Sequence, residues 1–195
     1  ILLLITPFIS IAQWEIQSSN FQDSLIGLEQ IWAVDYNTAW GIAYDDNSNP
    51  SLAQYFARTT DGGTNWTSDS IAGAYGWEAT GIFALNEDTA WVLLYNPVTD
   101  GGKIFRTNNA GVSWTHQSTA IFPASLGAYP NLINFWNENE GFCMGDPTEG
   151  YFEIYTTING GNQWNRVDST NMPALIPGEW GYAGYFSVVE NLISC

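Results

Sequence analysis

Three carboxylates in expected long loops have the type and setting needed for acid–base chemistry. Glu78 follows Trp77 and Glu179 precedes Trp180, so the two glutamates occupy near-equivalent places, and Asp146 lies in a third such loop. Two carboxyl groups about 5 Å apart suit a retaining glycosidase, and about 6.5–9.5 Å suits an inverting one. Sequence spacing does not give this separation. Glu78, Glu179 and Asp146 are therefore candidates for catalysis and no more.

Aromatic residues share these loops with the carboxylates. Flat rings beside negative charge suit stacking on a sugar or binding of a basic peptide. The predicted binding residues are Tyr75, Trp77, Tyr129, Trp180 and Tyr182. The alternative is that these rings pack against their own loops.

Other site chemistries find little support in the sequence. The only histidine, His116, lies in an expected strand with no partner for a Ser/His/Asp triad, so we interpret it as a surface residue. Residues 45–49 faintly resemble the start of a calcium loop, but Pro50 stands where that loop needs Gly and Phe56 where it needs Glu. No phosphate-binding, dinucleotide or zinc pattern occurs. We predict no metal and no cofactor.

A turn motif occurs three times along the chain. Its pattern is Thr-x-Asp/Asn-x-Gly-x-x-Trp, and its Trp recurs after 48 residues (66 to 114) and then 50 (114 to 164). Asx side chains accept backbone N–H bonds in turns, and Gly adopts positive φ freely. The Asp is replaced by Asn in two copies, which favours a structural role. The motif residues are Thr59, Asp61, Gly63 and Trp66; Thr107, Asn109, Gly111 and Trp114; Thr157, Asn159, Gly161 and Trp164.

A second repeat gives the register of the remaining strands. Trp40, Trp91, Phe142 and Ile193 are each 51 residues apart, and each lies in a pair of short apolar runs joined by a polar turn. Two strands from this frame and two flanking the turn motif make a four-stranded unit. Units of this size indicate an all-β fold, a β-propeller of four-stranded antiparallel blades.

The motif resembles the Asp-box (BNR) repeat of β-propellers, found in sialidases, sortilin-like receptors and photosystem II assembly/stability factor-like proteins. Sialidases bind their substrate with three arginines, whereas Arg58 and Arg106 stand beside the motif and only Arg166 is left. Blade length and the Arg-Thr before the motif look closest to the photosystem II factors, whose basic character is absent here. Asp-box xyloglucan hydrolases use acidic residues, and sortilin-like propellers bind peptides without catalysis.

The repeats divide the chain into blades at about 28–75, 79–125 and 130–176, with an incomplete blade at 184–195. Residues 13–19, which contain Trp14 in the place of the motif Trp, are expected to form a last strand that closes the ring. Since propellers have four to eight blades, we expect a fragment of a six- to eight-bladed propeller, and a four-bladed ring is the alternative. This expectation leaves room for further C-terminal domains in the full-length chain.

Residues 1–12 resemble the apolar core of a truncated secretory signal peptide, with a small-x-small cleavage site at Ser10-Ile11-Ala12. A buried first strand is the alternative. No other run is long enough to cross a bilayer. The expected location is therefore extracellular or at the cell surface. Cys143 and Cys195 are compatible with a disulfide or with two buried thiols.

Composition narrows the function further. The chain has 20 acidic and 4 basic residues, a net charge of −16, which disfavours nucleic acid and anionic membranes as partners. We predict an exported, non-catalytic binding or scaffold module for a protein or glycan ligand. A glycoside hydrolase and a purely structural surface repeat are the two alternatives.

Overall fold

The computed structural model describes residues 16–22, 25–45, 53–96, 98–99, 101–181, 187–189 and 192–194. The expected signal peptide, Trp14, most of the calcium-like stretch, Tyr182 and Cys195 lie outside these residues. Residues 16–19 form no strand.

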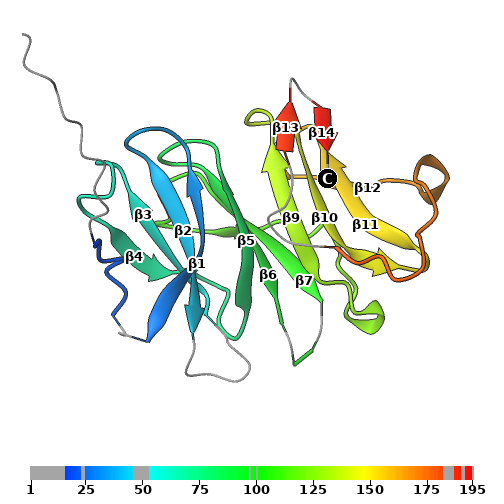
Figure 1. Cartoon of the computed structure of the whole chain (residues 1–195), viewed down its shortest axis with the longest axis horizontal. Coiled ribbons are helices and arrows are strands. Elements are labelled where there is room, and N and C mark those ends of the chain that lie inside the picture. The colour runs from blue at the N-terminus through cyan, green and yellow to red at the C-terminus, as the bar shows by residue number, and fades with distance from the viewer. Residues whose placement is uncertain are drawn as a thin grey trace, which may run out of the picture.

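The described chain forms three four-stranded antiparallel sheets, each a simple meander (Figure 1). The first contains β1 (Ile26–Ala33), β2 (Ala39–Asp45), β3 (Tyr55–Thr59) and β4 (Thr67–Ser70). The second contains β5 (Glu78–Ala84), β6 (Ala90–Tyr95), β7 (Gly102–Thr107) and β8 (Thr115–His116). The third contains β9 (Pro130–Phe135), β10 (Gly141–Thr148), β11 (Tyr151–Thr157) and β12 (Asn165–Arg166). A hairpin of β13 (Ser187–Val189) and β14 (Leu192–Ser194) follows, and two short 3₁₀ turns span Ala124–Leu126 and Ser169–Asn171. The predicted all-β fold class is confirmed.

Each pair of neighbouring sheets encloses its own apolar core. Trp40 lies between the first and second sheets and Trp91 between the second and third; both are fully buried. Each indole N–H donates to a backbone carbonyl of the next sheet, Trp40 to Asn86 at 3.0 Å and Trp91 to Gly160 at 3.2 Å. Tryptophans 51 residues apart thus fill the core and donate one hydrogen bond at successive sheet interfaces, which is why the 51-residue frame repeats in the sequence.

The three turn motifs, which we call the box turns, share one hydrogen-bond pattern. In the first, Thr59 Oγ1 donates to Asp61 Oδ1 at 2.9 Å and accepts from the Gly63 N–H at 3.0 Å. Asp61 Oδ1 also accepts from the Asn65 N–H at 2.8 Å. The equivalent bonds recur at Thr107 and Asn109 and at Thr157 and Asn159. Because Asn supplies the same accepting oxygen, the turn does not need a charge.

The tryptophan of a box turn faces the preceding sheet instead of covering its own loop. Trp114 packs edge-on against Trp40 and Phe56 of the first sheet. Trp164 donates from its indole N–H to Gln117 of the second sheet at 3.1 Å. Trp66 donates in the same way to Gln17 at 3.2 Å. Gln17 and Gln117 each stand three residues after a tryptophan, Trp14 and Trp114, so Gln17 stands in the same place in the repeat as Gln117.

The first strand of every sheet carries a one-residue bulge at the same place. The unpaired residues are Glu29, Thr80 and Asn131, which are 51 apart (80 − 29 and 131 − 80). Since β5 contacts both β1 and β9, these first strands lie next to one another. Thr80 Oγ1 donates across to the Pro130 carbonyl at 3.0 Å, so one bulge connects two sheets.

One expected long loop proved to be a tight turn. The sequence predicted that Asp146 lies in a long loop, but β10 contains this residue, runs on to Thr148 and pairs with Tyr151. Glu149 and Gly150 both have positive φ, 53° and 89°, as a two-residue hairpin turn requires. A bulge between Gly145 and Pro147 lets the strand continue past the proline, and this the sequence pattern did not reveal.

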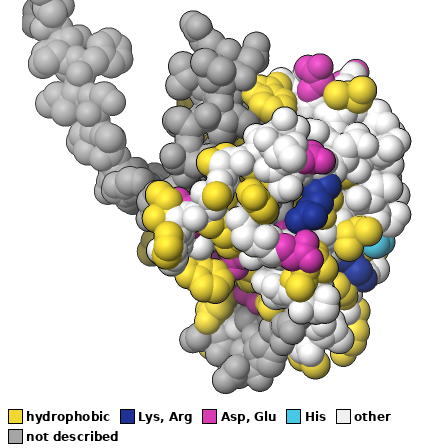
Figure 2. Space-filling view, turned by 90° about the vertical axis from the view of Figure 1, so that its right-hand side faces the viewer, with side chains coloured by type: hydrophobic (Ala, Val, Ile, Leu, Met, Phe, Trp, Pro, Cys, Tyr) yellow, Lys and Arg dark blue, Asp and Glu magenta, His cyan; other side chains and the backbone are white. Residues whose placement is uncertain are grey.

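Charged groups are sparse on the side of the molecule formed by the third sheet, where uncharged polar and apolar side chains cover most of the surface (Figure 2). In the part of the chain that the structure describes, no helix is long and apolar enough to cross a bilayer. Cys143 is a buried free thiol whose pKa is raised by burial.

Candidate functional site

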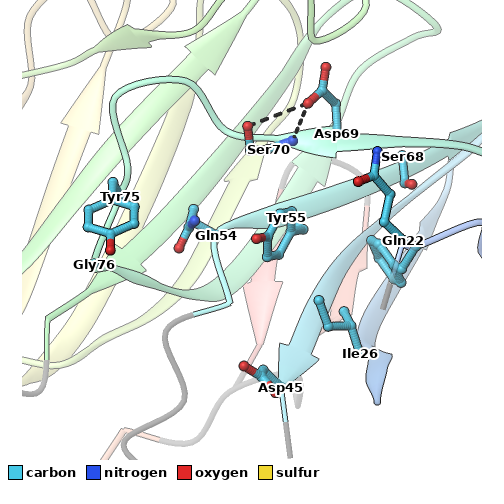
Figure 3. A pocket seen from close by; sticks show the side chains of 11 residues that line it. Gln22, Ile26, Asp45, Gln54, Tyr55, Ser68, Asp69, Ser70, Tyr75 and Gly76 are labelled. Carbon is cyan, nitrogen blue, oxygen red and sulfur yellow. Dashed lines mark hydrogen bonds between the residues drawn. The ribbon is translucent and has the colours of Figure 1, made fainter. Parts of the chain in front are cut away.

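A groove of about 860 Å³ crosses the strand ends of the first sheet that lie opposite its box turn (Figure 3). All four strands contribute, because β1 and β3 begin, and β2 and β4 end, at this edge. Register brings Ile26 opposite Asp45 and Tyr55 opposite Ser70. The lining residues are Phe21, Gln22, Ile26, Asp45, Gln54, Tyr55, Ser68, Asp69, Ser70, Tyr75 and Gly76. The set contains carboxylates, amides, hydroxyls and rings, and no basic residue.

Tyr75 stands out within this groove because its backbone is fixed while its ring is free. The loop that carries it is anchored by Ile71 and Ala74, both buried. Ile71 donates its N–H to the Gln54 carbonyl at 2.7 Å, and the Asn96 side chain donates to the Gly76 carbonyl at 3.0 Å. The Tyr75 side chain is nevertheless 91% exposed. An accessible ring on an anchored backbone loses little conformational freedom when it binds, which favours a binding contact.

The groove's negative charge comes from Asp45 and Asp69. Asp69 Oδ1 accepts from the Ser70 N–H at 2.6 Å and from the Ser70 hydroxyl at 3.4 Å, which orients this carboxylate. Both aspartates line the groove, as do Tyr55 and Tyr75 (Figure 3). Carboxylates beside tyrosine rings can hold an ammonium or guanidinium group.

A second acidic group surrounds Tyr129 at the same end of the sheets. Burial, and then the charges of Glu78, Glu29 and Asp146, raise the pKa of Tyr129. The Tyr129 ring lies 4.7 Å from that of Tyr95, measured between centroids. Burial, and then Glu29, raise the pKa of Glu78, which opens β5 opposite Tyr95.

The three catalytic candidates are only partly brought together. The charges of Glu78 and Asp146 both raise the pKa of Tyr129. Asp146 Oδ1 accepts from the Asn131 side chain at 2.7 Å and from the Gly181 N–H at 3.2 Å. Glu179 is exposed and accepts from the N–H of Ile176, in its own turn, at 2.7 Å.

The predicted aromatic residues also differ in their settings. Trp77 is partly buried against the first core, and the Lys103 ammonium lies 4.0 Å from its ring centroid. Trp180 is 73% exposed on a different segment from the groove. Of the four predicted rings in the part of the chain that the structure describes, Tyr75 alone is among the residues that line the groove.

The arginines do not converge as a sialidase triad would. Arg58 lies over Trp40 and pairs with Glu87, Arg106 lies over Trp91, and Arg166 donates to the buried Glu153 at 2.7 Å. Sequence reasoning did not single out Glu153, Asp69 or Tyr55. An isolated acidic residue within a strand was the only available signal for Glu153.

In the described part of the chain, no group of three or more His, Cys, Asp or Glu residues is arranged to hold a metal ion. The Asp-x-Asn-x-Asn stretch at 45–49 lies mostly outside the described residues.

Comparison with known proteins adds evidence for the fold. A solved structure described as YCF48 bound to D1 peptide matches with a TM-score of 0.55 and 18% identity, over 84% of this chain and 47% of that one. The fold is a β-propeller. A structure of YCF48 from Cyanidioschyzon merolae gives a TM-score of 0.45 and 21% identity, over 72% of this chain and 35% of that one. The chain thus spans about half the length, or less, of these structures. No protein-family model and no curated protein matches the chain.

Proposed function

We propose that this propeller is a non-catalytic recognition module that binds a basic segment of another protein in the Tyr75 groove. The observation that carries the proposal is an exposed ring on an anchored loop above a wall with two aspartates and no basic residue. A net charge of −16 would draw such a partner from a distance. A solved structure with this fold is described as bound to a peptide, which supports a peptide as the ligand class.

Export belongs to the proposal as well. It rests on the N-terminal sequence, where an apolar run ends at a small-x-small site. The partner would then be an extracellular or cell-surface protein. Detection of the protein in the medium or at the cell surface, with Gln13 as its first residue, is the expected result.

The binding test is an array of short peptides that differ in lysine and arginine content. We expect basic peptides with an aromatic or apolar neighbour to bind and acidic ones not to bind. Tyr75→Ala should weaken binding about tenfold or more, as loss of a central aromatic contact does. Tyr36→Ala is the matched control, because Tyr36 is 94% exposed in the β1–β2 turn at the other end of the sheet. Equal effects of both variants, or binding that ignores charge, would contradict the proposal.

A glycoside hydrolase is the second candidate, and the raised pKa of Glu78 is the observation that favours it. A carboxyl group that stays protonated at higher pH can serve as a general acid. A glycan array assayed for both retention and cleavage separates the two functions. Cleavage abolished by Glu78→Gln would replace the binding module with an enzyme, and glycan retention without cleavage would change only the ligand class. Silence in every assay would favour a structural repeat.

A further inference from the structure

A second pocket, of about 320 Å³, lies between the second and third sheets, at the opposite end of the sheets from the Tyr75 groove. It is bounded by the end of β7, by β8 and by the box turn of the third sheet. Its wall includes Arg106, His116, Thr115, Ser118, Asn108 and Asn162. No carboxylate lines it, in a chain with 20 acidic residues and only 4 basic ones.

Most polar side chains on this wall form no hydrogen bond with other described residues. Within the described residues, the hydrogen bonds of this set are those of Arg106 Nη1 to the Gly160 carbonyl at 3.2 Å and of Gln117, which clamps Gly160 and Trp164. Arg106 Nε is buried and has no acceptor there. A wall that presents several free donors to one small space favours a ligand rich in acceptors.

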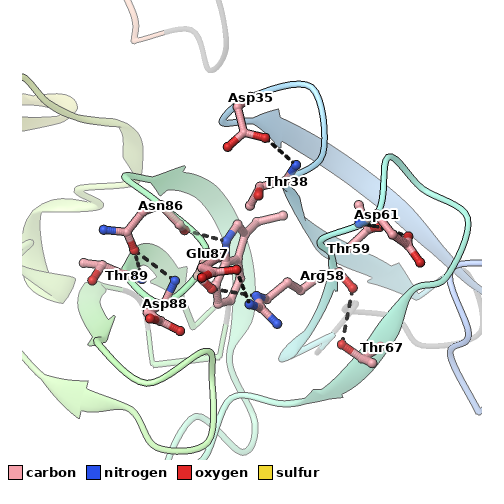
Figure 4. A network of polar contacts seen from close by, with 11 residues as sticks. Asp35, Thr38, Arg58, Thr59, Asp61, Thr67, Asn86, Glu87, Asp88 and Thr89 are labelled. Carbon is pink, nitrogen blue, oxygen red and sulfur yellow. Dashed lines mark hydrogen bonds and ion pairs between the residues drawn. The ribbon is translucent and has the colours of Figure 1, made fainter.

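A comparison with Arg58 shows that the charge of Arg106 is left available. The two arginines are equivalent, each standing before the threonine of a box turn and over a buried tryptophan. Arg58 donates from Nε to the Glu87 carbonyl at 2.6 Å and pairs with the Glu87 carboxylate at 3.9 Å (Figure 4). The charge of Glu138, the residue 51 after Glu87, raises the pKa of Arg106, which burial lowers more strongly. Among the described residues, however, Arg106 forms no ion pair within 4.0 Å.

One basic side chain, Arg106, faces the third sheet at this pocket, where it lies over Trp91 and donates to the Gly160 carbonyl. His116 stacks on Phe105 at 5.3 Å on the other face of the second sheet, and burial, followed by the charge of Lys103, lowers its pKa. Because His116 is next to Thr115 of the pocket wall, a charge bound there would lie close to its imidazole. The pocket wall therefore carries a guanidinium and no carboxylate within an acidic molecule.

We propose that this pocket binds an oxyanion group, such as the phosphate, sulfate or carboxylate of a small ligand. Arg106 supplies the charge, and Thr115, Ser118, Asn108 and Asn162 supply donors around it. The volume suits a compact group, since it stands at the lower end of the roughly 300–1,000 Å³ range of small-molecule sites. This site is separate from the Tyr75 groove and does not depend on the function proposed for it.

The single histidine makes a direct test possible, because its imidazole Hε1 gives one resolved signal in a proton NMR spectrum. Phosphate, sulfate and acetate are titrated in turn at constant ionic strength, with chloride as the balancing anion. We expect a saturable shift of the His116 signal for at least one oxyanion and a rise in the His116 pKa when it is bound. The ranking of the three anions identifies the chemical source of the group. A shift that is linear in concentration, or that chloride reproduces, would overturn the proposal.

Variants make the assignment specific. Arg106→Gln should weaken binding about tenfold or more, the loss expected for a charge-assisted hydrogen bond. Arg58→Gln, at the equivalent position, should leave binding unchanged. Ser118→Asp adds a negative charge at an exposed position on the pocket wall and should abolish binding even if Arg106→Gln folds poorly. Thr99→Asp adds the same charge in the exposed β6–β7 loop, at the other end of the sheet, and should have little effect. Identical behaviour of Ser118→Asp and Thr99→Asp would place the anion elsewhere.

Discussion

At the scale of single residues, the threonine of each box turn forms the hydrogen bonds that hold the turn together. Its hydroxyl accepts from the N–H of the following Gly and donates to the Asx side chain, as Thr107 does with Gly111 and Asn109. Thr107 is only 1% exposed, so water cannot replace these bonds. The side-chain oxygen of the Asx, by contrast, lies near the surface and needs no charge.

Thr107→Val keeps the shape of this side chain and removes its hydroxyl. The Gly111 N–H would then lack an acceptor, and we expect a loss of about 1–3 kcal/mol in unfolding free energy. Urea denaturation followed by tryptophan fluorescence measures it. Thr115→Val is the control, because the Thr115 hydroxyl is exposed and forms no hydrogen bond with the described residues. A loss of the same size in the control would show that the box-turn bonds contribute nothing specific.

Asp61 predicts a pH dependence that the other two box turns lack. The hydrogen bond from the Asn65 N–H, and then the Asn65 side chain, lower the pKa of Asp61 from its ordinary 3.8. A carboxyl whose folded pKa is lowered contributes stability above its unfolded pKa and loses it as pH falls through the folded pKa. Asp61→Asn should therefore lose less stability than the parent as the pH drops below about 4. Urea midpoints measured from neutral to acidic pH test this, and parallel curves would contradict it.

At the scale of elements, two glutamines connect a box turn to the segment that precedes its sheet. Gln117 is buried, donates to the Gly160 carbonyl at 2.9 Å and accepts from the Trp164 indole at 3.1 Å. Gln17 accepts from the Trp66 indole at 3.2 Å but is exposed. Both glutamines fit only because a box glycine faces them: a Cβ on Gly161 or Gly63 would lie 2.0 or 2.2 Å from the amide oxygen.

Gln117→Ala should therefore cost more than Gln17→Ala. The first leaves the buried Trp164 indole N–H without an acceptor, at about 1–3 kcal/mol, while the Gly160 carbonyl keeps its bonds from Trp91 and Arg106. The second leaves the Trp66 indole, which water can reach. Paired urea titrations of the two variants measure the difference. Equal losses would mean that the sheet contacts, and not these bonds, hold the interface.

Much of this architecture could be predicted from the sequence, because box turns and buried tryptophans repeat with it. Trp40 and Trp91 are visible as a 51-residue period, and so are the strand pairs around them. The site could be predicted less well. Asp69 lies in β4, three residues after Trp66, where the next repeat has Gln117 just after β8, and only the fold shows that it lines the same groove as Tyr75. The sequence predicted that Trp77 is a binding ring, whereas in the structure the Lys103 ammonium lies over it.

At the scale of the whole molecule, net charge should govern both stability and association. Twenty acidic residues against four basic ones repel each other in the compact state, and salt screens this repulsion. Raising sodium chloride at neutral pH should raise the urea midpoint of unfolding. The effect should fade at an acidic pH where most carboxylates are protonated. A midpoint that falls with salt at neutral pH would show that attractive pairs such as Arg166–Glu153 outweigh the repulsion.

The bulges at Glu29, Thr80 and Asn131 have a consequence for how such a chain can change in length. The 51-residue spacing of the bulges is constant, whereas the box-turn tryptophans are spaced by 48 and then 50 residues. The differences in length therefore fall between the first strands and the box turns, and not within the first strands. A segment that runs from one bulge to the next begins and ends at equivalent positions of a first strand. If such a segment were duplicated, the copy could join its neighbours without moving any side chain to the other face of its sheet.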